Sequence, residues 1–356
     1  MTTASDKYTN LTDGQIVQRI NEIKSKRGNS LLMLGHHYQR DDVIGFSDLQ
    51  GDSFLLARQA ADSTASDIVF LGVHFMAETA DILTDADQRV FMPDTDAGCE
   101  MADMANVVDV STCWDRIVQR WGDSVIPVTY VNSTAAIKDF CGRHGGLTCT
   151  SSSAFEAFSF ALEEGERLLF LPDWCLGTNT AKRMGIGSDE IAIYDRCKDQ
   201  FHGSGDPKVI LWDGFCPVHQ DFGVEDILQF RRAHPNGRVV VHPECKPEAV
   251  SKADCSGSTE FIRSAVSDAG PDTVWAVGTE TNLVHRLDQQ YSDRKVNVLG
   301  STAGPCEDMM KITRKKLLHL LEQMENETAD EFRISVAPRV AEGARLALER
   351  MLDLSS

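Results

Sequence analysis

Three cysteines stand at similar positions in the sequence, each a short distance beyond an apolar run and close behind a glycine. The residue pairs are Gly98 with Cys99, Gly214 with Cys216, and Gly304 with Cys306. In an open parallel sheet, ligands bind beyond the carboxyl ends of the strands. The repetition indicates three similar units, each contributing one thiolate to a common centre. The preceding apolar runs cover 89–93, 209–212 and 295–300.

The spacing of these thiols leaves three interpretations open. Zinc sites usually take cysteines in closely spaced pairs, and the sequence contains no Cys-x-x-Cys. A [4Fe–4S] cluster held by three thiolates keeps one iron free to act as a Lewis acid. Free thiols that are simply buried in the core remain the third possibility.

Polar side chains gather at the ends of other predicted strands. Hydroxyl and amide groups there, especially at helix N-termini, suit the binding of carboxylate or phosphate. His242 and Glu244 are two residues apart, so on an extended segment both point the same way and can act as an acid–base pair. The remaining members are His36, His37, Tyr38, Ser53, Tyr130, Asn132, Ser151, Ser258 and Thr259.

Length and composition restrict the class of protein. The chain has 356 residues, 42% hydrophobic and 25% charged, which predicts a globular protein with more than one domain. Its formal charge of −19 disfavours nucleic acid and anionic membranes as partners. No apolar run is long enough to cross a bilayer, and the polar N-terminus predicts no secretory signal. We therefore expect a cytoplasmic protein whose ten cysteines are reduced.

Short apolar runs alternate with amphipathic stretches, and this pattern restarts twice. Such alternation is typical of parallel sheets with crossover helices, so we predict an α/β protein of three units. Strands are predicted at 30–34, 68–73, 89–92, 125–131, 147–150, 167–171, 209–212, 238–241, 274–277 and 296–299. Helices are predicted at 14–27, 52–61, 74–83, 134–143, 154–164, 179–184, 224–234, 258–269, 308–327 and 338–354.

Several motifs resemble those of quinolinate synthases, in the order that this family shows, from about Leu31 to Met351. The most specific are Gly72–Thr79 (GVHFMAET) and the spacing of Cys99, Cys216 and Cys306. The others are His36–Gln39, Gly51–Ser53, Pro93–Met101, Tyr130–Ser133, Thr150–Ser152, Phe215–His219 (FCPVH), His242–Cys245 and Gly278–Leu283.

The resemblance implies three αβα sandwich domains in a pseudo-threefold arrangement around a central active-site cavity. We expect domains at 1–107, 108–218 and 219–306, with helices in 307–356 packing back on the first. The implied reaction condenses iminoaspartate with dihydroxyacetone phosphate to quinolinate, for NAD biosynthesis. Transient contact with the enzyme that supplies iminoaspartate is a further expectation.

The resemblance also implies roles for individual residues. Cys99, Cys216 and Cys306 would hold a [4Fe–4S] cluster with one open iron. Tyr38, His242 and Glu244 would be the acid–base residues. Substrate would contact His36, Ser53, Tyr130, Asn132, Ser151 and Thr259.

Alternatives come from other classes of protein. An aconitase-like [4Fe–4S] hydro-lyase would dehydrate a small acid without forming a carbon–carbon bond. A non-catalytic iron–sulfur protein would have no use for His242 and Glu244, and a zinc-stabilised structural protein would contain no iron.

The sequence departs from the resembled family at one motif. Many family members carry Pro-Asn-Met after the third cysteine, whereas this chain has Glu307-Asp308-Met309.

Overall fold

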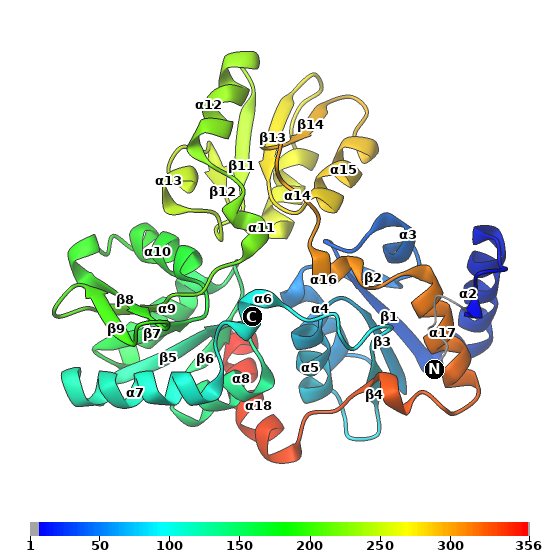
Figure 1. Cartoon of the computed structure of the whole chain (residues 1–356), viewed down its shortest axis with the longest axis horizontal. Coiled ribbons are helices and arrows are strands. Elements are labelled where there is room, and N and C mark those ends of the chain that lie inside the picture. The colour runs from blue at the N-terminus through cyan, green and yellow to red at the C-terminus, as the bar shows by residue number, and fades with distance from the viewer. Residues whose placement is uncertain (1–6, 355–356) are drawn as a thin grey trace. The chain divides into compact units, whose positions relative to one another are not determined.

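The computed structural model describes residues 7–354 and shows an α/β protein with three mostly parallel sheets (Figure 1). Helices flank each sheet, as the sequence predicts for αβα sandwiches. The chain divides into two compact units. Unit 1 comprises Met1–Cys99 and Pro305–Val336, and unit 2 comprises Glu100–Gly304 and Ala337–Ser356.

Unit 1 contains one five-stranded sheet, in the order β15-β4-β3-β1-β2, and only the β15–β4 pairing is antiparallel. The first helix begins at a capping box in which Thr12 and Gln15 bond reciprocally. The strands are β1 (Leu31–His36), β2 (Leu49–Gly51), β3 (Asp67–Leu71), β4 (Arg89–Phe91) and β15 (Arg333–Ile334). The helices are α2 (Asp13–Arg27), α3 (Asp41–Ile44), α4 (Ser53–Ala61), α5 (His74–Leu83), α16 (Glu307–Met310) and α17 (Arg314–Glu325), with short 3₁₀ turns η1 (Gly28–Ser30) and η3 (Asp330–Phe332).

Unit 2 contains the other two sheets. The six-stranded second sheet has the order β6-β5-β7-β10-β8-β9, with one antiparallel pairing, β8–β9. The four-stranded third sheet has the order β12-β11-β13-β14 and is parallel throughout. The second sheet consists of β5 (Val125–Tyr130), β6 (Leu147–Cys149), β7 (Arg167–Leu171), β8 (Ile191–Asp195), β9 (Gln200–Gly203) and β10 (Val209–Trp212). The third consists of β11 (Arg238–Val241), β12 (Cys255–Ser256), β13 (Val274–Gly278) and β14 (Lys295–Val298).

The helices of unit 2 cover both faces of the second sheet. Leu169, Leu171 and Trp212 share one apolar cluster with α7, α8 and α18. On the opposite face Phe158 of α9 packs on Phe170, and a Cβ at Gly177 of α10 would meet Phe170 and Leu211. The helices are α6 (Glu100–Asp103), α7 (Val107–Trp121), α8 (Ala135–Arg143), α9 (Ala154–Glu164), α10 (Trp174–Arg183), α11 (Pro217–Gln220), α12 (Val224–Ala233), α13 (Pro247–Val250), α14 (Thr259–Ser267), α15 (Thr281–Gln290) and α18 (Pro338–Leu354), with the 3₁₀ turn η2 (Ser188–Glu190).

The C-terminal segment differs from the prediction in two ways. The single helix expected at 308–327 is two helices, because the chain leaves α16 at Lys311 and Thr313 caps the start of α17. Helix α17 packs on α2 within unit 1, as expected, but α18 packs on α8 and β6 in unit 2. A Cβ on Gly142 would lie 1.9 Å from the carbonyl oxygen of Gly343, so glycines allow this close contact. The domain boundaries themselves stay a prediction.

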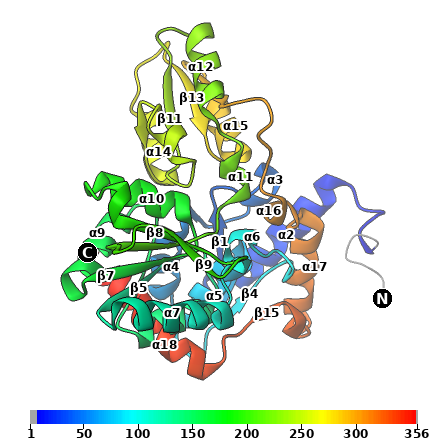
Figure 2. The same ribbon diagram turned by 60° about the vertical axis from the view of Figure 1, so that its left-hand side comes forward.

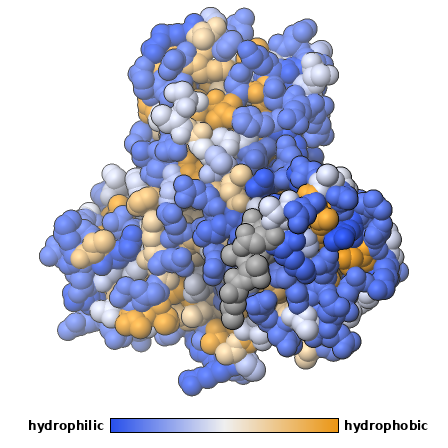
Figure 3. Space-filling view, turned by 45° about the vertical axis from the view of Figure 1, so that its right-hand side comes forward, coloured by the Kyte–Doolittle hydropathy of each residue, from blue (hydrophilic) through white to orange (hydrophobic). Residues whose placement is uncertain are grey.

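Figure 3 shows one face of the molecule, on which hydrophobic residues are scattered among hydrophilic ones. The exposed large hydrophobic side chains are few and come from separate elements, for example Leu55, Val108, Leu228 and Phe261. Within residues 7–354, no helix combines the length and apolarity that a membrane span requires.

Candidate active site

The three cysteines singled out by their spacing are all partly exposed, whereas five of the other seven are buried. Cys99 follows β4 and Cys306 directly precedes α16, both in unit 1. Cys216 follows β10 in unit 2 and directly precedes α11. Grouping of the three around one cluster therefore stays a prediction.

The five buried thiols differ from these three in their tendency to ionise. Desolvation raises the pKa of each fully enclosed cysteine, which keeps it protonated and makes it a poor metal ligand. These residues are Cys113, Cys141, Cys149, Cys175 and Cys245.

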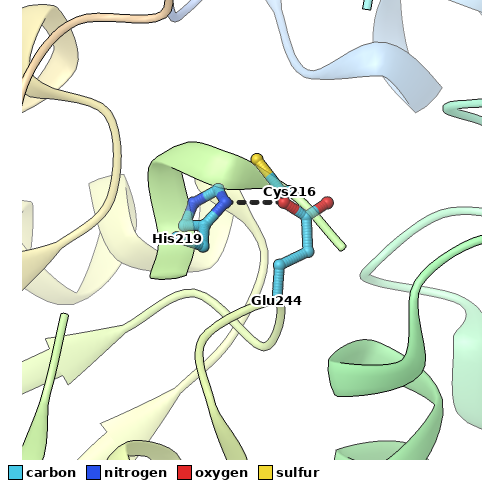
Figure 4. A group of neighbouring side chains, drawn as sticks. All are labelled: Cys216, His219 and Glu244. Carbon is cyan, nitrogen blue, oxygen red and sulfur yellow. Dashed lines mark ion pairs between the residues drawn. The ribbon is translucent and has the colours of Figure 1, made fainter. Parts of the chain in front are cut away.

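Unit 2 brings Cys216, His219 and Glu244 together (Figure 4). One ligand-capable atom from each lies within 4.8 Å of the others. Nδ1 of His219 is 2.6 Å from Oε2 of Glu244, and Nε2 of the same ring is 3.1 Å from Oγ1 of Thr279. In the tautomer that carries its proton on Nδ1, facing the carboxylate, Nε2 accepts a hydrogen bond from the Thr279 hydroxyl.

The short distance between His219 and Glu244 argues against one metal ion shared by this pair. Two ligand atoms on a tetrahedral zinc with bonds of about 2.0–2.1 Å lie roughly 3.3 Å apart. The observed 2.6 Å is instead a direct polar contact between the imidazole and the carboxylate. The arrangement therefore orients the Glu244 carboxylate beside a partly exposed thiol.

His242 completes this cluster. Its ring stacks on that of His219, with 4.6 Å between centroids, and its Nδ1 lies 3.7 Å from Oε2 of Glu244. The expectation that residues 242–244 are extended is wrong, because the Cys245 N–H bonds the His242 carbonyl and closes a turn. The turn nevertheless keeps both side chains on the same side.

Burial and the interaction between His242 and Glu244 shift the pKa values of both side chains, and the two effects act in opposite directions. Burial lowers the pKa of His242 to about 3, despite the nearby carboxylate, so the ring is neutral. Burial raises the pKa of Glu244, but His242, His219 and a hydrogen bond from Tyr130 outweigh it and set the pKa at about 2. The cluster thus presents an ionised carboxylate beside a neutral imidazole.

Tyr130 is the last residue of β5, and Asn132 lies on the loop that follows. Besides the bond from Tyr130 to Glu244, this loop offers the side-chain oxygen of Asn132, which is buried and has no hydrogen-bond partner in the described part of the chain. An unsatisfied buried acceptor is costly, so this atom suits a donor group on a bound molecule.

The other predicted binding residues lie at strand ends or helix starts, as expected. In unit 1, His36 ends β1, its ring is 4.8 Å from that of Tyr38, and Ser53 begins α4. In unit 2, Ser151 follows β6 and Thr259 begins α14 behind the capping residue Ser258.

His219 is the member of this cluster that sequence reasoning did not single out. The motif Phe215–His219 contains a signal for it, since Cys216 and His219 are three residues apart and so adjacent on a helical turn. The element that realises this spacing, α11, is only four residues long. Its partner Thr279 is sixty residues away in sequence, and no local pattern indicates that pairing.

Comparison with known proteins gives consistent results along nearly the whole chain. The family model described as quinolinate synthetase A protein matches residues 18–353. A quinolinate synthase of Listeria innocua is 47% identical over 353 residues, which is 98% of this chain and 96% of that protein. A quinolinate synthase of Bacillus cereus is 47% identical over 98% of this chain and 95% of its own length.

Proposed function

Because the chain belongs to the quinolinate synthase family, we propose that it condenses iminoaspartate with dihydroxyacetone phosphate, releasing phosphate and two waters, to form quinolinate for NAD biosynthesis. The observation that carries the proposal is the buried group of Tyr130, His219, His242 and Glu244 beside the partly exposed Cys216.

Cys99, Cys216 and Cys306 are the proposed ligands of a [4Fe–4S] cluster. In support, all three are partly exposed at strand ends or helix starts, whereas most of the other thiols are enclosed. The unpartnered Asn132 oxygen in the Tyr130 loop likewise suits a bound group. When bound by three thiolates, such a cluster supplies a Lewis acid to a substrate oxygen.

Tyr38, His242 and Glu244 are the proposed acid–base residues. At neutral pH Glu244 is ionised and His242 is neutral, so both are in the proton-accepting form that the proton removals of imine chemistry and carbon–carbon bond formation require. Having accepted a proton, each can return it to a departing hydroxyl. His219 holds Nδ1 2.6 Å from Oε2 and thereby helps to fix the orientation of the Glu244 carboxylate.

The substrate-binding residues follow from the same proposal. Asn132 would accept a hydrogen bond from a nitrogen or hydroxyl of the substrate, and Tyr130 would lie beside it. His36, Ser53, Ser151 and Thr259 would hold carboxylate or phosphate, with Ser53 and Thr259 favoured by the helix N-termini where they lie.

We also propose a cytoplasmic location and transient contact with the enzyme that supplies iminoaspartate. The proposal of a reducing compartment rests on the low share of cysteine, ten in 356 residues, which is not the density of a disulfide scaffold.

The first experiment tests the ligand assignment. Iron and sulfide are measured on anaerobically purified protein, together with the EPR spectrum before and after a quinolinate-like dicarboxylate is added. We expect about four irons and a spectrum that shifts. Cys216→Ala should lose iron, whereas the matched variant Cys245→Ala, at a buried thiol, should retain it. The reverse pattern would overturn the assignment.

The second experiment tests the acid–base role. Glu244→Gln should keep the iron content and lose turnover by at least about 100-fold, the lower range for a general acid–base group. Product analysis separates the proposed reaction from a hydro-lyase, because one yields a pyridine dicarboxylate and the other an alkene. Near-normal turnover of Glu244→Gln would remove this residue from the mechanism.

A further inference from the structure

Asn179 makes an unusual pair of contacts with the backbone around Glu244. Its side-chain amide donates to the carbonyl oxygen of Pro243 at 2.8 Å and to that of Cys245 at 2.9 Å. These are the carbonyls of the residues immediately before and after Glu244. An asparagine amide has two N–H donors in one plane at a fixed spacing, so a single side chain holds both ends of the Glu244 residue.

The two partners come from different sheets of unit 2. Asn179 lies on α10, which packs on the second sheet, whereas residues 242–245 follow β11 of the third sheet. Helices α10 and α13 are in contact, and both views place α10 next to the third sheet (Figure 1 and Figure 2). The support for Glu244 is therefore a contact between sheets.

The same helix also holds the backbone of Cys216. Asp173 caps the N-terminus of α10, where its Oδ1 accepts the Leu176 N–H at 2.6 Å, and its Oδ2 accepts the Cys216 N–H at 3.2 Å. Helix α10 and its capping residue thus contact the chain at the backbone of Cys216 and on both sides of Glu244. Side chains that orient reacting groups in this way commonly affect function without touching substrate.

We propose that Asn179 is a positioning residue that sets the orientation of the Glu244 carboxylate towards His219 and Cys216. Without its two donors the Pro243 and Cys245 carbonyls lose their partner, and the turn is free to rotate Glu244 away from Nδ1 of His219. The structural claim stands on these contacts alone. Its expected effect on catalysis rests on the proposed function.

The test uses Asn179→Leu, which keeps the size of the side chain and removes both donors. Lys182→Ala, at an exposed position on the same helix, is the matched control. The direct readout is the proton NMR resonance of His219 Nδ1–H, which reports the close contact of this nitrogen with Glu244 and needs no turnover. We expect this resonance to move or vanish in Asn179→Leu and to stay unchanged in Lys182→Ala.

Activity is the second readout. A displacement of about 1 Å costs up to about 100-fold in rate, so kcat of Asn179→Leu should fall about 10- to 100-fold, with little change in KM and unchanged iron content. An unchanged resonance together with wild-type kcat overturns the proposal. A moved resonance with wild-type kcat supports the positioning and counts instead against the acid–base role of Glu244.

A measurement on the unmodified protein covers the case in which Asn179→Leu does not fold. Hydrogen exchange of the Asn179 side-chain amide, followed in selectively ¹⁵N-labelled protein, should be slowed for both protons because both are donated. Exchange of both protons at the rate of a solvent-exposed amide overturns the proposal.

Discussion

Two loops of unit 2 carry residues of the candidate site, and they are held in place in different ways. The Tyr130–Ser133 loop follows β5 and is supported from α8, the next helix along the chain, by Lys138. The His242–Cys245 turn follows β11 and is supported by Asn179, more than sixty residues earlier in sequence. One support is local and charged, and the other is distant and neutral.

The two supports are expected to contribute to different properties, one to the stability of the fold and the other to the geometry of the candidate site. Lys138 is fully buried, and its ammonium group donates to the carbonyls of Val131 and Ser133, so it satisfies backbone groups that no water reaches. Asn179 is partly exposed and sets how one sheet's turn faces another sheet's helix. We therefore expect damage to the first support to lower the free energy of unfolding, and damage to the second to change mainly the site.

The largest expected effect on stability comes from Lys138→Met. The substitution removes the donor to the Ser133 carbonyl and one of the two donors to the Val131 carbonyl, which also accepts the Ser133 N–H. An unsatisfied buried carbonyl costs about 1–3 kcal/mol, and the change also relieves the cost of burying a charge. The free energy of unfolding should fall by about 3 kcal/mol, as measured by denaturant titration. Lys182→Met is the control at an exposed site. A loss below about 1 kcal/mol would contradict the structural role given to Lys138.

An intermediate effect is expected from pH, and it acts on the other loop. The pKa of His242 falls from 6.5 to about 3 on folding, so below pH 6.5 the unfolded chain takes up a proton that the folded chain does not. The stability from this residue is complete above pH 6.5 and is lost as the pH falls towards 3. The slope is about 1.4 kcal/mol per pH unit, or about 2 kcal/mol between pH 6.5 and 5.

The check on this pH effect compares metal-free wild-type protein with His242→Gln in denaturant titrations at several pH values. The variant should show the shallower dependence between pH 6.5 and 5. Parallel curves would mean that His242 is protonated equally in the folded and unfolded states. Glu244 adds to the acid lability only below pH 4.5, because its pKa is also lowered on folding.

The smallest expected effect comes from Ser133→Ala. The Ser133 hydroxyl donates to the carbonyl of Tyr130 at 2.8 Å and closes the loop on itself. Its removal should cost about 1 kcal/mol, the usual contribution of one such bond, as measured by denaturant titration. A loss as large as that of Lys138→Met would contradict the ranking of the two supports, because the hydroxyl would then stabilise this loop as much as the ammonium does.

The contrast between the two loops also explains what the sequence could predict. Apolar runs gave β7, β10 and β11 with the right bounds, and amphipathic spacing did so for α5, α9 and α18, because these signals are local. The placing of Cys216 behind β10 and of Thr259 at a helix start followed from the same patterns.

The parts that were missed depend on contacts between distant segments. Strands β2, β12 and β15 are two or three residues long and exist through pairing with longer neighbours. His219 is held by contacts with Thr279 and Glu244, which come from other segments of the chain. The backbone beside Glu244 is in turn held by Asn179, from a further segment. Helices α7 and α15 were not predicted although Asn106 and Glu280 cap them, since a cap signals a boundary only where a helix is already suspected.

The packing of α18 on α8 has a consequence for how the protein is made. Neither unit is continuous in sequence, since unit 1 gains β15 and unit 2 gains α18 from the final segment. During synthesis, α8 and β6 stay uncovered on one side until residues near Leu348 have left the ribosome. All six strands of the second sheet end by Trp212, so this sheet stays uncovered on one side until α18 has been made, and nascent chains should depend on chaperones until then.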